Sequence, residues 1–346
     1  MEIAGLTRRV VVRDPADAGE ARRQAQSAAE RAGLDETRKA RLAIIVAEMA
    51  SNLAKHATAG GEMLINVLDG ANGSAGVEVL ALDRGPGISN PQAVMEDRVS
   101  SAGTLGIGLG SIRRQADEFA FHSLRTRGTT ILARIYTDGP RPDRRTFDIG
   151  MVHVARDGEE VSGDAWSVRP VGDGIDVMVV DGLGHGLLAA DAAGTAVSAF
   201  RRNGHPSPAE TLRAMHDSMR ATRGATAAIA AIDTNAGLLT YGGVGNIAGA
   251  ICDHDRTRRL VSLNGTLGRE PVSYKQFQSA WTEGATLVMH SDGLTSKWRF
   301  DDLPGLLDKD PTLIAAVLFR DYARDLDDAI VLVLRQNSYA KLRAPA

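Results

Sequence analysis

The feature that most constrains the fold of this chain is the segment 175–186, which reads I-D-V-M-V-V-D-G-L-G-H-G. Its apolar, β-branched run indicates a buried strand that ends at a carboxylate, Asp181, followed by glycine at every second position. Glycines after a strand let the backbone turn and approach a ligand closely, because they carry no Cβ. The arrangement is typical of a site that holds a hard cation through oxygen ligands.

Three further acids stand beside predicted strands. Asp164 follows a Ser-Gly pair, Asp292 lies in the run L-V-M-H-S-D-G, and Asp327 lies in the run L-D-D-A-I-V-L-V-L. A single Asp-Gly pair is more often a turn than a metal site. Together with Asp181 and the backbone carbonyl of Gly182, however, the acids predict one all-oxygen centre that suits Mg²⁺ or Mn²⁺ and suits Zn²⁺ poorly. Two such ions can hold a bridging hydroxide for attack on a phosphoester.

Composition sets only broad limits. The chain has 346 residues, enough for about two domains, and its net charge of −3 gives no electrostatic reason to expect nucleic-acid binding. Cys252 is the only cysteine, which excludes an internal disulfide framework and a thiolate metal cluster. No apolar run approaches the ~18 residues that span a membrane, and the N-terminus has no apolar signal core. We therefore expect a cytoplasmic protein without a membrane partner.

The first part of the chain carries a second ordered set of motifs. Residues 35–56 are predicted to form a helix on which Glu48, Asn52 and His56 recur at intervals of four, and such polar residues are usually solvated. Strands are predicted at 62–68 and 77–82, and D-R-G-P-G follows the second strand. A glycine-rich run, G-T-L-G-I-G-L-G, then precedes a helix that is predicted to begin at Ser111.

Combined, these motifs can bind ATP and Mg²⁺. A glycine-rich loop before a helix N-terminus offers free N–H groups and a positive dipole end to phosphate. Asp83 can accept a hydrogen bond from the adenine amino group, and Gly87 leaves room beside the ring. Asn52 can complete a Mg²⁺ shell through its carbonyl oxygen, and Glu48 can orient or deprotonate a nucleophile.

The ordered set resembles the GHKL ATP-binding fold, in the branch of the RsbT/RsbW-type anti-sigma-factor serine kinases. The matching segments are E-x3-N at 48–52, D-x-G-x-G at 83–87, G-x-G-x-G at 106–110 and G-T-T at 128–130. The chain lacks the dimerisation helices and phospho-acceptor histidine expected of a histidine kinase. The resemblance implies a catalytic role for Glu48 and a Mg²⁺ role for Asn52. The residues it implies for ATP binding are Asn52, Asp83, Gly85, Gly87, Gly106, Gly108, Gly110 and Thr129.

After a Pro-rich, charged stretch the pattern changes to many short strands, with two neighbouring helices at 187–202 and 208–221 and a third at 301–319. Such a pattern indicates a β-sandwich covered by helices rather than a parallel α/β sheet. We predict an α+β protein of two domains. The boundaries are 1–137 for the ATP-binding domain, 138–146 for the linker, 147–336 for the second domain and 337–346 for a tail.

The acidic motifs of the second domain resemble the PPM metal-dependent serine/threonine phosphatases, in the SpoIIE/RsbX branch. The matching segments are S-G-D at 162–164, D-G-L-G-H-G at 181–186, G-G-V-G-N at 242–246, S-D-G at 291–293 and D-D at 327–328. The resemblance implies an α-β-β-α sandwich in which Asp181 is catalytic and bridges two ions, and the Gly182 carbonyl serves one of them. Asp164, Asp292 and Asp327 complete the other. The sequence departs from many relatives in offering no N-terminal arginine for the substrate phosphate.

The two resemblances imply a bacterial signalling protein that dephosphorylates phosphoserine or phosphothreonine and also carries a serine kinase-like domain. The implied substrate is a STAS-domain protein of a partner-switching or stressosome pathway, with a sigma factor as a second candidate partner. Two alternatives stay open. The ATP-binding domain can be a non-catalytic binding module, or both domains can be degenerate scaffolds, which the intact acidic set disfavours. The sequence does not decide between Mg²⁺ and Mn²⁺, and it is compatible with an oligomer.

Overall fold

The computed structural model describes residues 6–57, 60–69, 75–88, 105–139, 146–202, 207–269, 273–324 and 327–337. The chain divides into two compact units. The N-terminal unit comprises Thr7–Asp143 together with Asp308–Arg320, and the C-terminal unit comprises Arg144–Leu307 and Asp321–Ala346. Across the described ranges, no helix combines the length and the apolar character needed to cross a membrane.

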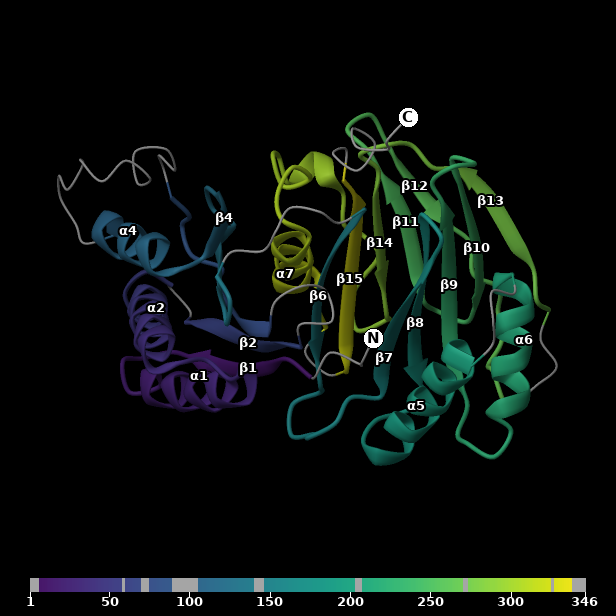
Figure 1. Ribbon diagram of the computed structural model, residues 1–346, viewed down its shortest axis with the longest axis horizontal. Helices are drawn as coiled ribbons and strands as arrows, with labels where there is room; N and C mark the ends of the chain where they lie inside the picture. Colours follow the sequence, from purple (N-terminus) through teal and green to yellow (C-terminus); the bar gives the residue numbers. More distant parts are fainter. Residues whose placement is uncertain are drawn as a thin grey trace. The chain divides into compact units, whose positions relative to one another are not determined.

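The N-terminal unit is built on one antiparallel sheet with the strand order β1-β2-β3-β5-β4. Helices α1 and α2 pack against each other on one face of this sheet (Figure 1). The elements are β1 (Arg8–Val12), α1 (Ala18–Ala32), α2 (Glu36–His56), β2 (Gly61–Asp69), β3 (Ala75–Asp83), α4 (Leu105–Gln115), β4 (Glu118–Leu124), β5 (Gly128–Tyr136) and α7 (Pro311–Tyr322).

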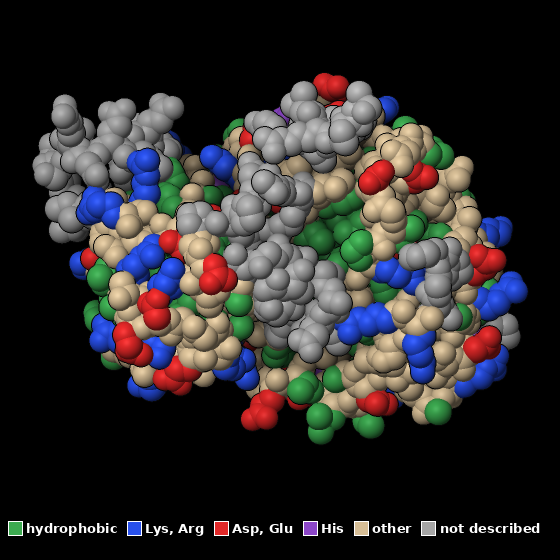
Figure 2. Space-filling model, viewed as in Figure 1, with side chains coloured by type: hydrophobic (Ala, Val, Ile, Leu, Met, Phe, Trp, Pro, Cys, Tyr) green, Lys and Arg blue, Asp and Glu red, His purple; other side chains and the backbone are tan. Residues whose placement is uncertain are grey.

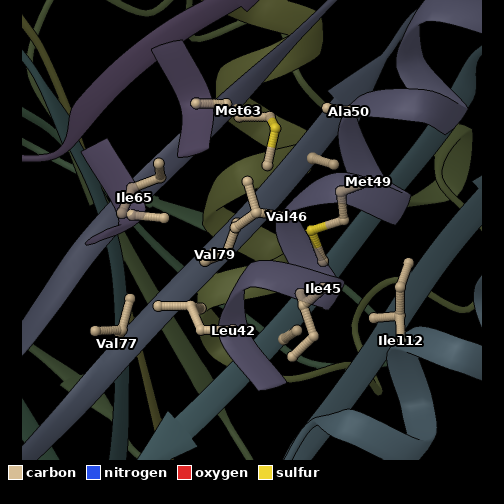
Figure 3. Packing of buried hydrophobic residues seen from close by; sticks show 14 of the residues in the cluster. Leu42, Ile45, Val46, Met49, Ala50, Met63, Ile65, Val77, Val79 and Ile112 are labelled. Atoms are coloured by element: carbon tan, nitrogen blue, oxygen red, sulfur yellow. The ribbon is translucent and has the colours of Figure 1, made fainter. Parts of the chain in front are cut away.

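Helix α2 carries the main apolar contribution to this core. Asp35 caps the helix, because its side chain accepts a hydrogen bond from the backbone N–H of Arg38 at 2.8 Å. Figure 3 shows the apolar side chains of α2 directed toward those of β2 and β3. The labelled residues are Leu42, Ile45, Val46, Met49 and Ala50 from α2, Met63 and Ile65 from β2, Val77 and Val79 from β3, and Ile112 from α4. This packing fixes the orientation of the polar face of α2 that carries the candidate site.

Helix α7 covers the other face of the sheet, to which the alternate residues of β3 and β5 point. Arg134 of β5 is buried there and donates to Glu78 at 2.7 Å and to both carboxylate oxygens of Asp310 at 2.8 and 2.9 Å. At the other end of α7, Arg320 donates to the hydroxyl of Thr130 at 3.1 Å. Residues 308–320, which the sequence analysis places in the second domain, therefore complete the N-terminal unit.

The helix predicted at 301–319 is shorter in the structure. Only a 3₁₀ turn, η1 (Phe300–Asp302), occupies its first residues, and α7 begins at Pro311. Pro304 and Gly305 interrupt the helical pattern, whereas proline is favoured as the first residue of a helix because it has no N–H to satisfy.

The C-terminal unit is a sandwich of two antiparallel sheets, β13-β10-β9-β8-β7 and β12-β11-β14-β15-β6. Helices α5 and α6 lie side by side on the outer face of the first sheet (Figure 1). The elements are β6 (Phe147–Val154), β7 (Asp164–Val171), β8 (Gly174–Gly182), α5 (Leu187–Arg202), α6 (Pro208–Ser218), β9 (Ala225–Asp233), β10 (Leu238–Val244), β11 (Ala248–Cys252), β12 (Thr257–Leu260), β13 (Gln276–Ala280), β14 (Thr286–His290) and β15 (Ala329–Gln336).

The two-sided burial of strand β8 explains why residues 177–180 are all apolar. Val177 and Val179 point into the core between the two sheets, while Met178 and Val180 point into a second core beneath α5 and α6. Because successive side chains of a strand face opposite sides, burial of both faces requires a continuous apolar run. The α+β class predicted from the sequence is confirmed.

The visible surface of the molecule carries side chains of both charge signs, and Figure 2 shows Lys and Arg interspersed with Asp and Glu over both units. This mixture agrees with the small net charge of −3.

Candidate functional site

The acidic cluster of the C-terminal unit begins with two carboxylates on neighbouring strands. Asp164 is the first residue of β7 and lies directly opposite Asp181 of β8 in the antiparallel register. On the other side of β8, Thr226 of β9 is the partner of Asp181. Residues that pair in this way have Cβ atoms only about 5 Å apart. Strand pairing therefore brings acids from separate motifs together at one end of the first sheet.

The second sheet supplies the next part of the cluster. The hydroxyl of Ser291 donates to Asp164 Oδ2 at 2.6 Å. Asn246 donates to Asp292 Oδ2 at 2.7 Å and accepts from the Thr226 hydroxyl at 2.5 Å. These side-chain bonds tie the ends of the two sheets together and fix the orientation of both carboxylates.

The pair Asp327-Asp328 stands immediately before β15. Asp328 accepts backbone N–H groups from Arg156 at 2.9 Å and from Gly163 at 2.8 Å, so both of its oxygens are engaged. Asp327 is exposed, and only the backbone N–H of Asp328 donates to it, at 2.9 Å, among the contacts found in the described residues. Asp327 is therefore the better placed of the two to bind a cation.

The carboxylates raise one another's pKa values. Burial raises the pKa of Asp164 well above its usual value, and the charge of Asp181 raises it further. Burial together with the charges of Asp292, Asp327 and Asp328 raises the pKa of Asp181 to about 7. The pKa of Asp292 is also raised, by burial and by Asp327. Burial is the largest cause of each shift and repulsion between the carboxylates is the next. A divalent cation would offset both, because it favours the charged carboxylates, so the cluster fits such an ion.

The available ligand atoms are carboxylate and carbonyl oxygens, which favour a hard ion such as Mg²⁺. Within the ranges that the structure describes, no three His, Cys, Asp or Glu side chains form a group that could hold a metal on their own. Mg²⁺ does not require such an enclosure, because it keeps several waters and usually takes one or two carboxylates. The carboxylates that could contribute ligands are Asp164, Asp181, Asp292 and Asp327, with the carbonyl of Gly182.

Two polar partners in this region are not evident from the sequence. Ser291 belongs to the S-D-G motif, but no pattern links it to Asp164, which is distant in the chain. Glu159 lies 2.6 Å from Nδ1 of His185, in a partly exposed pair beside the glycine loop. His185 is therefore held by a carboxylate.

The N-terminal unit contains a pocket at the position of the predicted ATP site. Its lining residues are Met49, Asn52, Leu53, His56, Ala81, Asp83, Pro86, Gly87, Ile88, Leu109, Thr129 and Ile131. Glu48 and Asn52 of α2 lie against Gly108 of α4, since a Cβ at Gly108 would be 3.1 Å from Glu48 Oε2 and 3.2 Å from Asn52 Oδ1. The structure thus brings together three of the residues that the sequence analysis selected.

The polar groups of the pocket suit a nucleotide. Asp83 ends β3 and accepts the backbone N–H of Gly85 at 2.7 Å, and burial raises the pKa of its carboxyl group. Asn52 Nδ2 and His56 Nε2 are buried without a hydrogen-bond partner in the described part of the chain. Buried polar atoms are normally paired, so these two nitrogens are available to a polar ligand.

The glycine-rich run differs from its prediction as a loop before Ser111. Helix α4 begins at Leu105, so Gly106, Gly108 and Gly110 lie inside the helix. Leu109 is 2% exposed and Ile112 is fully buried, and this packing offsets the cost of about 1 kcal/mol that each helical glycine carries. The first residues of the run, 103 and 104, lie outside the described residues.

Two family models match the chain, one in each part. The model of the histidine kinase-like ATPase domain matches residues 11–135, and the model of stage II sporulation protein E (SpoIIE) matches residues 172–337.

Individual relatives agree with this division. The chain is 35% identical to the serine/threonine-protein kinase RsbT of Bacillus subtilis (strain 168) over 113 residues, which cover 33% of this chain and 84% of RsbT. It is 24% identical to the phosphoserine phosphatase RsbX of the same organism over 140 residues, 40% of this chain and 70% of RsbX. A solved structure from work on the bacterial stressosome as a modular system adapted to control secondary messenger signaling is 30% identical, with a TM-score of 0.50. The match covers 55% of this chain and 99% of that one.

Both resemblances inferred from the motifs are thereby confirmed. The chain belongs to the RsbT-like family of histidine kinase-like ATPase domains in its N-terminal part, and its C-terminal part carries a phosphatase domain of the SpoIIE/PP2C type.

Proposed function

We propose that this protein removes phosphate from phosphoserine or phosphothreonine of a STAS-domain protein, under the control of its own ATP-binding unit. The observation that carries the proposal is the pairing of Asp164 with Asp181 across β7 and β8, with Asp292 joined to the same end of the sandwich through Asn246 and Thr226. The relatives are a serine/threonine-protein kinase and a phosphoserine phosphatase, and a similar solved structure comes from work on the bacterial stressosome. These similarities support a STAS-domain protein as substrate.

In this proposal Asp164, Asp181, Asp292 and Asp327, with the carbonyl of Gly182, would hold Mg²⁺ or Mn²⁺ ions, and Asp181 would be the shared central ligand. Bound ions would supply an activated water and would neutralise the phosphoryl oxygens. The protein's own contribution is to position the ligands. Ser291 orients Asp164 by donating to one oxygen, and Asn246 orients Asp292 in the same way.

The ATP-binding unit is proposed to bind ATP with Mg²⁺ and to phosphorylate the same class of protein. Asp83 would accept from the adenine amino group, Asn52 would offer its carbonyl oxygen to Mg²⁺, and Glu48 would orient or deprotonate the attacking hydroxyl. The adjacency of Glu48 and Asn52 beside Gly108 favours retained chemistry. The unpaired nitrogens of Asn52 and His56 favour nucleotide binding even without catalysis, so an ATP-dependent binding module is the second candidate.

The phosphatase test measures phosphate release from a phosphorylated STAS protein with Mn²⁺ or Mg²⁺. We expect turnover by the wild type and a loss of at least about 100-fold in Asp181→Asn, because a bridging carboxylate is removed. Asp191→Asn changes an exposed acid of α5 and serves as the matched control. Circular dichroism checks that each variant is folded. Undiminished turnover in Asp181→Asn contradicts the metal-site assignment.

The kinase test incubates the protein with labelled ATP and candidate STAS proteins. Label transfer by the wild type and its loss in Glu48→Ala, with ATP binding retained, supports the kinase. No transfer from the wild type, together with ATP-dependent capture of a STAS protein or sigma factor, supports the binding module instead.

A further inference from the structure

We propose that Arg223 binds the phosphoryl group of the substrate, in the role for which the sequence offers no N-terminal arginine. The inference rests on the proposed phosphatase function and names a further residue of that site. The ligand class is a phosphate monoester dianion, and the interaction is a paired hydrogen bond from one guanidinium to two phosphoryl oxygens.

Arg223 lies in the loop between α6 and β9, which runs beside the glycine loop that follows Asp181. The backbone N–H of Leu183 donates to the carbonyl of Gly224 at 3.0 Å and joins the two loops. A Cβ at Gly184 would stand 3.1 Å from Nη1 of Arg223, so the guanidinium lies directly against this loop. Gly184 has a φ of +83°, a conformation that favours glycine, and its missing Cβ leaves the space that the guanidinium uses.

The backbone of Arg223 is held firmly while its side chain stays exposed. Its carbonyl accepts from Arg269 Nε at 2.8 Å. The next residue, Gly224, donates its N–H to the Thr222 hydroxyl at 3.1 Å, and this hydroxyl donates to the carbonyl of Met219 at 2.8 Å. A fixed backbone keeps the reach of the Arg223 side chain within the neighbourhood of the glycine loop that follows Asp181.

The charge of Arg223 is not neutralised by a carboxylate among the residues that the structure describes. Arg220, three residues earlier, donates to Asp217 at 3.1 Å, and Arg169 donates to Asp176 at 2.6 Å. Because no described carboxylate pairs with the Arg223 guanidinium, its N–H donors are available to an incoming oxyanion. Its planar donors match two oxygens of a phosphoryl group.

The test measures binding and turnover separately. Isothermal titration of inorganic phosphate into the Mn²⁺-loaded full chain is compared for the wild type, Arg223→Ala, Arg223→Lys, the rival Arg324→Ala and the control Arg220→Ala. We expect phosphate affinity to fall about tenfold in Arg223→Ala, to recover in part in Arg223→Lys, and to stay unchanged in Arg220→Ala. The KM for p-nitrophenyl phosphate and for a phosphorylated STAS protein should rise together in Arg223→Ala.

Three results would overturn the inference. The first is unchanged phosphate affinity in a folded Arg223→Ala protein. The second is a KM that rises for the phosphoprotein alone, which would make Arg223 a contact for the protein substrate. The third is a loss of phosphate affinity only in Arg324→Ala, since Arg324 donates its N–H to the carbonyl of Gly293 beside Asp292 and is the rival arginine. A wild type that binds phosphate through Arg223 but hydrolyses nothing contradicts the phosphatase function and leaves this inference intact.

Discussion

The hydroxyl of Ser291 donates a hydrogen bond to Oδ2 of Asp164 at 2.6 Å. Both residues are buried, with 0% exposure for Ser291 and 3% for Asp164. The bond connects the loop after β14 in one sheet to the first residue of β7 in the other. It occupies Oδ2 of Asp164 and leaves Oδ1 available to a cation. The carboxylate that would bind the ion is therefore oriented before any ion arrives.

Ser291→Ala should weaken metal binding without removing a ligand. Loss of the hydroxyl leaves Asp164 free to rotate, and removal of such a supporting bond typically costs 10- to 100-fold in metal affinity. Mn²⁺ titration by calorimetry measures the effect, and Ser218→Ala, at an exposed position of α6, is the control. Equal Mn²⁺ affinity in Ser291→Ala and wild type would show that Asp164 needs no such support.

The metal-free protein should be more stable at pH 5 than at pH 8 in the part of its stability that depends on Asp181. The pKa of this group is raised from 3.8 to about 7, so the folded state favours the protonated form. The contribution of Asp181 to the free energy of unfolding is complete below about pH 4 and is lost as the pH rises through about 7. We expect the fall in unfolding free energy from pH 5 to pH 8, measured by urea unfolding, to be larger in the wild type than in Asp181→Asn by on the order of 2 kcal/mol, because the raised pKa values of Asp164 and Asp292 act in both proteins. A wild-type profile that parallels the variant's would refute it.

Arg134→Ala should destabilise the N-terminal unit strongly. The substitution leaves the buried Glu78 and the partly buried Asp310 without their cation, and breaking a buried ion pair from one side costs about 3–5 kcal/mol. Chemical denaturation followed by circular dichroism gives the value. Arg8→Ala, at an exposed position of β1, should change stability by less than about 0.5 kcal/mol. A small effect of Arg134→Ala would mean that the network contributes little to the fold.

Gly108→Ala should separate nucleotide binding from stability. Alanine favours a helix over glycine by about 1 kcal/mol, so α4 itself should not be weakened. The new methyl group, however, would press on Glu48 and Asn52 at 3.1 and 3.2 Å and displace them. We expect weaker binding of a fluorescent ATP analogue at unchanged or higher melting temperature. Gly194→Ala in α5, where nothing lies within 4 Å of the new atom, should raise stability and leave nucleotide binding unchanged.

Local patterns were sufficient to select the acids of the C-terminal unit as candidate site residues. Each acid stands immediately before or after an apolar run, and the two ends of a strand lie at the two ends of its sheet. The pairing of Asp164 with Asp181 could not be predicted, since register depends on which strands become neighbours. Arg223 gave no signal at all. Its importance arises only from the contact with Gly184, which is a property of two loops in three dimensions.

The limits of propensity are clearest at the glycine-rich run. Three glycines in five residues favour a loop, yet the burial of Leu109 and Ile112 makes the segment helical. The sequence also could not predict that α7 belongs to the N-terminal unit. A linker rich in proline and charge suggests a boundary, but it carries no information about which sheet a distant apolar helix will cover.

The helix α7 has a consequence for how the protein is made. The sheet of the N-terminal unit is synthesised by residue 136, whereas the helix that covers its second face follows only at residues 311–322. While the ribosome is translating most of the phosphatase sequence, the face that carries Arg134 and Glu78 has no covering helix. The N-terminal unit therefore receives its last helix only after most of the phosphatase sequence has been synthesised.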